Sequence, residues 1–156
     1  MLHRVLPLLL GVAFAASAQQ PYNGPKPPKS DLPYLKHADQ LLATEIATAK
    51  EDKKKDSSLY TIDGVNSTAK TPLASPIFIF QSDKINPESL QLYRLENKGG
   101  HREITISKRG PEPIRMQVTR LGVPNLYRLE VYNDLESGEY SLSPSGSNTV
   151  FCFSVF

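Results

Sequence analysis

The sequence predicts a mainly all-β protein, an antiparallel β-sandwich, and three features of the chain support this fold class. From Leu59 onward, short segments of alternating apolar and polar residues recur between Gly, Pro and Asn turns. Two hairpins place their apolar pairs on one face in only one register. Counting these segments gives about seven to nine short strands over roughly one hundred residues, as in sandwich domains. A short N-terminal helix before these strands is also compatible with the sequence.

Residues 1–18 have the pattern of a secretory signal peptide. A basic start at Arg4 precedes the apolar run Val5–Ala15, and Ala16-Ser17-Ala18 supplies small residues at the cleavage positions. The alternative is a buried N-terminal helix. No later apolar run approaches the roughly twenty residues that a transmembrane helix needs. We therefore expect an exported protein, periplasmic or extracellular, with no transmembrane segment after cleavage.

Residues 19–33 are expected to form an extended tether, and residues 34–156 a single domain. The tether sequence, QQPYNGPKPPKSDLP, contains five prolines and a glycine, which disfavour regular structure. The domain is long enough to bury a substantial core.

The segment from Leu35 to Lys55 permits two interpretations. Apolar residues recur at helical spacing, and good helix formers dominate, which favours a helix within residues 34–56. However, Thr44–Thr48 also alternates as a strand does, and the charged residues after it could form the turn of a long hairpin. We favour the helix.

The next part of the chain predicts a strand at Leu59–Asp63 and a central strand at Ile77–Phe80. Because Ile77–Phe80 is apolar at every position, both of its faces should be covered. Two further strands, Ser89–Glu96 and Arg102–Lys108, should form a hairpin around Asn97–Gly100.

The hairpin around Gly122–Asn125 can be tested for internal consistency. If these four residues form the loop, Met116 faces Val131 and Val118 faces Leu129. The same register places polar pairs on the opposite face, and a shift of one residue would destroy both sets.

The last hairpin turns at Ser143–Ser147 and contains the only cysteine. Tyr140, Leu142, Phe151, Phe153 and Val155 share one predicted face, whereas Cys152 lies on the other. We expect the last strand to be covered on both faces and Cys152 to be buried. An exposed Cys152 would instead permit an intermolecular disulfide.

The stretch Leu135–Ser143, with its Gly-Glu-Tyr-Ser-Leu-Ser sequence, resembles the closing hairpin of uncharacterised exported bacterial β-sandwich proteins. Thr71–Phe78 resembles a segment that leads into a core strand in similar proteins. The resemblance covers about the last two thirds of the chain and implies a sandwich fold. It carries no activity and no functional residue.

The charge balance and the motifs favour a non-catalytic protein over an enzyme, without a cofactor. With 18 basic and 16 acidic residues, the chain has no strong field for nucleic acid. No nucleophile elbow is present. A hydrolase or metalloenzyme would have to use His37, Asp39 and His101, whose spacing is weak for a metal site. Surface histidines are the simpler interpretation.

One polar face is the best candidate surface for binding. In the register above, six side chains point outward from the sheet: Arg115, Gln117, Thr119, Arg128, Glu130 and Tyr132. Such a face can bind sugars or a protein strand. A solvated face has the same composition, because antiparallel sheets commonly leave one side wet.

The resulting functional hypothesis is an exported binding or structural module that acts through a sheet face or edge. Its partner would be a protein or glycan of the cell envelope, and its oligomeric state is open. A carbohydrate-binding domain is the alternative, although the absence of tryptophan removes the commonest stacking residue. The metal-dependent hydrolase is the third hypothesis.

Overall fold

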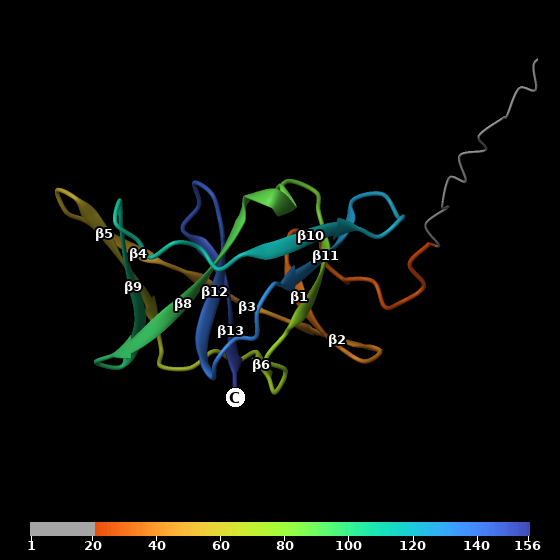
Figure 1. Ribbon diagram of the computed structural model, residues 1–156, viewed down its shortest axis with the longest axis horizontal. Helices are drawn as coiled ribbons and strands as arrows, with labels where there is room; N and C mark the ends of the chain where they lie inside the picture. Colours follow the sequence, from red (N-terminus) through yellow and green to blue (C-terminus); the bar gives the residue numbers. More distant parts are fainter. Residues whose placement is uncertain (1–20) are drawn as a thin grey trace, which may run out of the picture.

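Two mainly antiparallel sheets, built from thirteen strands, make up the computed structural model, which describes residues 21–156 (Figure 1). The predicted all-β sandwich is confirmed. The strands outnumber the prediction because the segment before Leu59 also forms strands. The predicted signal peptide, residues 1–18, lies outside the described residues. Within residues 21–156, no helix has the length and apolar character needed to cross a membrane.

The first sheet has five strands and a fully covered central strand. Its strands lie in the order β10 (Met116–Arg120), β11 (Leu126–Val131), β7 (Ile77–Gln81), β1 (Pro33–His37) and β2 (Gln40–Ala43). Phe78, Ile79 and Phe80 of β7 are completely buried. This confirms that both faces of the apolar strand are covered.

The second sheet curls, and its two edge strands are consecutive in the chain. Its order is β3 (Glu45–Thr48), β13 (Thr149–Val155), β12 (Gly138–Pro144), β8 (Leu90–Lys98), β9 (His101–Ser107), β5 (Ser57–Asp63) and β4 (Lys50–Lys53). The short β6 (Lys70–Thr71) pairs with β13 in parallel, and the 3₁₀ turn η1 (Pro87–Ser89) leads into β8. Only Ala49 separates β3 at one edge from β4 at the other. We call this second sheet the curled sheet.

The main core lies between the two sheets. Phe78 from the first sheet meets Phe153 of β13 edge to face, with ring centroids 5.0 Å apart. Tyr140 of β12 stacks on Phe153 at 5.5 Å. Such aromatic pairs add about 0.5–1.5 kcal/mol beyond their buried area. The inward residues predicted for the last hairpin therefore do build the core.

A second, smaller core lies inside the curled sheet. It consists of residues from β5, β8 and β13 and the residue between β3 and β4: Ile62, Leu95, Val150, Cys152 and Ala49. Because side chains alternate along a strand, β13 supplies Phe151 and Phe153 to the main core and Cys152 to the second. The last strand is therefore buried on both faces, as predicted.

The predicted helix within residues 34–56 is wrong. This segment forms β1 to β4, and no helix lies in it. The helical propensity of these residues is outweighed by strand pairing, because β1 pairs with β7, β3 with β13 and β4 with β5. Between β2 and β3 the chain passes from the first sheet to the curled sheet at Thr44, whose hydroxyl and N–H both donate to the Pro33 carbonyl.

Both tested hairpin predictions are confirmed. Met116 pairs with Val131 and Val118 with Leu129, as the register required. The β8–β9 hairpin turns at Gly99 and Gly100, whose φ angles of 57° and 86° suit glycine.

The end of the predicted tether is fixed to the domain. The Asp31 carboxylate accepts hydrogen bonds from the backbone N–H groups of Asp83, Lys84 and Ile85. Leu32 and Pro33, which follow, are buried. Asp31 thus anchors the start of β1 to the loop after β7.

Candidate functional site

A cavity of about 390 Å³ opens into the interior of the curled sheet. It forms because β8 and β9 pair only near their turn, at Glu96–Lys98 and His101–Glu103. Beyond these residues, β8 pairs with β12 and β9 pairs with β5, so the interior is accessible. The volume lies within the range of about 300–1,000 Å³ found for small-molecule sites.

The cavity is lined by apolar, hydroxyl and amide groups and by one charged side chain. The apolar side chains include those of the second core other than Cys152, together with Ile104 and Ile106. Besides Tyr60 and Tyr93, six residues contribute hydroxyl or amide groups: Gln91, Ser141, Ser143, Ser145, Ser147 and Asn148. Glu51 is the charged residue. Such a lining can hold a small ligand by contact and orient it by hydrogen bonds.

Glu51 is held in place by two hydroxyl groups. Ser58 and Tyr60 each donate to its Oε1 at 3.0 Å. Burial, and then the hydrogen bond to Glu51, raises the pKa of Tyr60, so its phenol stays protonated at neutral pH. Lys53, an exposed side chain, lies 3.8 Å from Oε2.

Tyr93 is the second aromatic residue of the cavity. It is 8% exposed, and its hydroxyl donates to Oε1 of Gln91 at 3.3 Å. Burial raises the pKa of Tyr93, and the negative charge of Glu112 raises it further. Both tyrosines of the cavity are thus neutral phenols with an apolar ring and a polar end.

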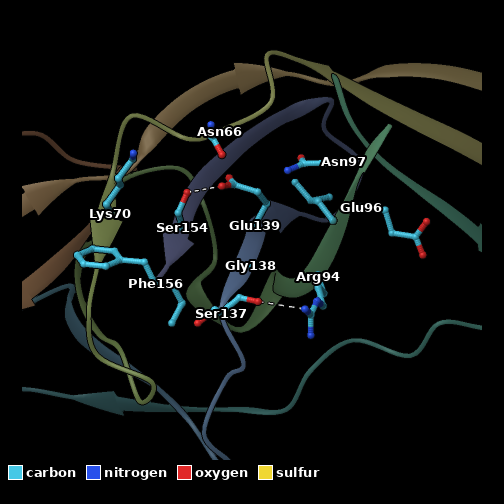
Figure 2. A pocket seen from close by; sticks show the side chains of 12 residues that line it. Asn66, Lys70, Arg94, Glu96, Asn97, Ser137, Gly138, Glu139, Ser154 and Phe156 are labelled. Carbon is cyan, nitrogen blue, oxygen red and sulfur yellow. Dashed lines mark hydrogen bonds between the residues drawn. The ribbon is translucent and has the colours of Figure 1, made fainter. Parts of the chain in front are cut away.

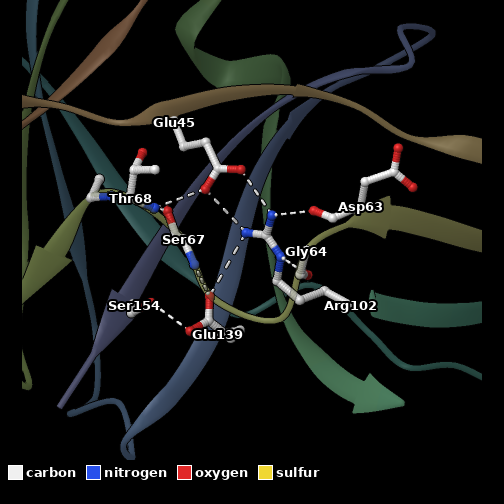
Figure 3. A network of polar contacts seen from close by, with 9 residues as sticks. Glu45, Asp63, Gly64, Ser67, Thr68, Arg102, Glu139 and Ser154 are labelled. Carbon is white, nitrogen blue, oxygen red and sulfur yellow. Dashed lines mark hydrogen bonds and ion pairs between the residues drawn. The ribbon is translucent and has the colours of Figure 1, made fainter. Parts of the chain in front are cut away.

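A polar network around the buried Arg102 crosses the interior of the curled sheet, outside the cavity lining (Figure 3). Arg102 of β9 is completely buried and donates from Nη2 to Oε1 of Glu45 at 2.8 Å. It also donates to the backbone carbonyls of Asp63 and Gly64. Glu139 lies 3.8 Å from Nη1. Arg102 therefore has polar partners on the strands and loop around it, as a buried charge requires.

The two carboxylates of this network are satisfied by other donors as well. Glu45 accepts the backbone N–H of Thr68, and Glu139 accepts the backbone N–H of Ser67 and the hydroxyl of Ser154. Burial raises the pKa of Glu45, but its hydrogen bonds, above all from Arg102, outweigh burial and hold the pKa below its ordinary value. Glu45 is therefore ionised and structural at neutral pH.

A broader groove of about 950 Å³ lies outside this network (Figure 2). Glu139 and Ser154 line it together with the exposed Phe156. Its arginine, Arg94, is already paired, because it donates to Glu136 and to the Ser137 carbonyl. The groove is more open than the cavity, whose lining includes the half-buried Tyr60 and the buried Tyr93, so the cavity is the stronger candidate site for a small ligand.

The structure does not assemble the predicted metal site. His37 shares a hydrogen bond of 2.9 Å with Thr71, and it lines a shallow hollow with Asp39. His101 instead pairs with Glu103 at 2.7 Å in the β8–β9 hairpin. Among residues 21–156, no three His, Cys, Asp or Glu side chains are grouped to hold a metal ion.

The predicted polar face exists, but part of its charge is paired internally. Arg128 Nε lies 3.0 Å from the Glu130 carboxylate, with an angle too poor for a hydrogen bond. Gln117 is exposed and Thr119 is half-buried on β10. Arg115 and Tyr132, which are also exposed, lie just beyond the paired ends of β10 and β11, where the Tyr132 N–H donates to the Arg115 carbonyl. Near the loop, Arg120 lies over the ring of Tyr127, 5.9 Å from its centroid.

Cys152 is completely buried in the second core, as predicted. Burial raises the pKa of its thiol to about 12, although Arg102 acts in the opposite direction. A protonated, inaccessible thiol does not react with a second chain, so the folded domain offers no intermolecular disulfide at this position.

The sequence analysis did not single out Glu45, Glu51, Tyr60, Tyr93 or Arg102. The alternation of side chains along the strands did contain evidence that two of these residues point inward. Arg102 has the same parity as Ile104 and Ile106, and Glu51 has the same parity as Ala49. These positions face a second interior only because the sheet curls, and no local sequence pattern indicates that curling.

Comparison with protein-family models, curated proteins and solved structures finds no match to this chain.

Proposed function

We propose that this chain is an exported, non-catalytic binding module that takes a small ligand into the cavity of the curled sheet. The observation that carries the proposal is the lining of the cavity, where two tyrosines and Glu51 lie beside serine hydroxyls and apolar side chains. Concave sites with an apolar lining and a few fixed polar groups are typical of small-ligand binding. This site differs from the outward sheet face expected from the sequence.

The absence of a reactive arrangement in the described cavity supports binding rather than catalysis. Glu51 is fixed by Ser58 and Tyr60, and the protonated Cys152 thiol is buried in the second core, outside the cavity lining. The lining contains no histidine that would activate one of its serine hydroxyls as a nucleophile. The residues around the cavity can therefore hold and orient a ligand.

Thermal-shift screening of the purified protein with a library of small molecules tests this proposal. A ligand that binds only the folded protein raises its melting temperature. Ser143→Phe would fill the mouth of the cavity and should abolish the shift, whereas Thr105→Phe, at an exposed position of β9, should preserve it. The proposal fails if no compound stabilises the protein, or if Ser143→Phe responds as the parent does.

Export is the second part of the proposal and rests on Arg4, the apolar run after it and Ala16-Ser17-Ala18. Mass spectrometry of the protein recovered from the periplasm or the medium should show an N-terminus at Gln19. Recovery of the uncleaved chain from the cytosol would contradict export and leave the cavity proposal untouched.

Carbohydrate is a candidate ligand class for the same cavity, and its partner would be a glycan of the cell envelope. The support is the number of hydroxyl and amide groups at the cavity, together with two tyrosine rings on which a sugar could stack. A glycan array tests this class, and binding that Ser143→Phe removes would support it.

A further inference from the structure

The cavity carries a negative charge without a positive counterpart in its lining. Glu51 is the charged residue among the side chains that line it, and no Lys, Arg or His contributes to the lining. Lys53, which lies 3.8 Å from Glu51, has a side chain that is 78% exposed, so solvent screens its effect. The interior is therefore favourable for a cation and unfavourable for an anion.

The carboxylate of Glu51 has bonding capacity left for a ligand. Oε1 accepts the hydroxyls of Ser58 and Tyr60, which fix the orientation of the group. Oε2 makes no hydrogen bond in the described structure, and an ionised carboxylate can accept at both oxygens. A charge held in this way can receive an N–H donor or a quaternary ammonium without rearrangement.

The two tyrosines add a second attraction for the same ligand class. Tyr60 and Tyr93 both line the cavity as neutral phenols. The face of an aromatic ring attracts an ammonium or guanidinium group by about 0.5–2 kcal/mol, more when water is excluded.

We propose that the cavity selects a small organic cation, an ammonium or guanidinium compound, with Glu51, Tyr60 and Tyr93 as its recognition residues. This inference rests on the proposed binding function and assigns its ligand class. Serine hydroxyls and amide groups would contact the remaining polar atoms of the ligand. A neutral sugar could use the same hydroxyls and rings, but it would gain less from the charge of Glu51.

Calorimetric titration with matched probes separates the two ligand classes. The cationic probes are tetramethylammonium, choline and arginine methyl ester, and the neutral probes are glucose and 3,3-dimethylbutan-1-ol, the carbon isostere of choline. We expect choline to bind about tenfold more tightly than its isostere, and salt to weaken only the cationic probes.

Two variants test the role of the carboxylate. Glu51→Gln keeps an acceptor for Ser58 and Tyr60 but removes the charge, so the affinity for cations should fall about tenfold. Asp52→Asn removes a charge one residue away on the exposed side of β4, outside the cavity lining, and should leave the affinity unchanged. Tyr60→Leu and Tyr93→Leu should each weaken cation binding.

The results also distinguish failure of this inference from failure of the binding function. Equal binding of choline and its isostere, or equal loss in Glu51→Gln and Asp52→Asn, would overturn the cationic ligand class. Binding of glucose that Ser143→Phe abolishes would overturn it as well, while supporting the binding function. If no compound in the probe set or in the wider library binds in a way that Ser143→Phe removes, both proposals fail.

Discussion

The buried guanidinium of Arg102 and the half-buried carboxylate of Glu45 form an ion pair of 2.8 Å between β9 and β3, two strands that are not adjacent in the curled sheet. Because the backbones of β3 and β9 are not hydrogen-bonded to each other, this side-chain ion pair links two separate strands across the interior of the curled sheet (Figure 3). The passage from β3 to β4 at Ala49 links the same two edges of the curled sheet through the chain. Neither Arg102 nor Glu45 lines the cavity.

Removing the arginine should destabilise the fold strongly. Arg102→Met keeps much of the side-chain volume but leaves the half-buried Glu45 and the buried Glu139 without their cation. We expect a loss of about 3–5 kcal/mol in the free energy of unfolding, measured by urea denaturation. Asp63→Asn breaks the exposed pair between Lys50 and Asp63 and should cost less than about 1 kcal/mol. A stable Arg102→Met protein would show that the pair does not hold the curled sheet.

Acid should weaken the domain through Glu45. Its pKa in the folded protein lies below the ordinary value near 4.5, so folding favours the ionised form. The resulting stabilisation is complete above the ordinary pKa and is lost as pH falls through the lower, folded value. The free energy of unfolding should therefore decline below about pH 4.5, and Glu45→Gln should flatten this decline.

Asp31 should contribute in the same direction, because three backbone N–H groups hold its pKa below the ordinary value despite some burial. Asp31→Asn provides an independent measurement, since Asp31 lies at the start of β1 and not in the polar network. An unchanged pH profile in both variants would contradict this account of the acid sensitivity.

The Cys152 thiol should be unreactive in the folded protein. It is completely buried, and its pKa of about 12 leaves almost no thiolate at neutral pH. A thiol reagent such as dithiobis-nitrobenzoate should label the protein only after denaturation, and a non-reducing gel should show monomers. Rapid labelling of the native protein would show that the second core opens.

The outward face of β10 and β11 and the cavity can be separated by mutation. Arg128→Ala and Tyr132→Ala alter the face without touching the cavity lining. If the cavity is the binding site, these variants should bind a cavity ligand with the parent affinity in calorimetric titration. If both variants lose binding without losing stability, the binding site is the outward sheet face and not the cavity.

The register of the strands could be predicted because it depends on local alternation. A one-residue shift between β10 and β11 would expose Met116 and Val118 together with their partners, so one pairing is favoured by burial alone. The same reasoning placed Phe151 and Phe153 on one side of β13 and Cys152 on the other.

By itself, the sequence determined the all-β class, the hairpin pairings and the burial of the last strand on both faces, since each follows from neighbouring residues. It did not determine that β1 to β4 replace a helix, because partners distant in the chain outweigh local propensity there. Glu51 and Tyr60 are opposite each other in the local β4–β5 hairpin, but only the tertiary structure brought Glu45 to Arg102, and Tyr93 to the same cavity as Glu51 and Tyr60. The curling of the sheet decides these contacts, and it arises from strand pairing across the whole domain rather than from any single segment.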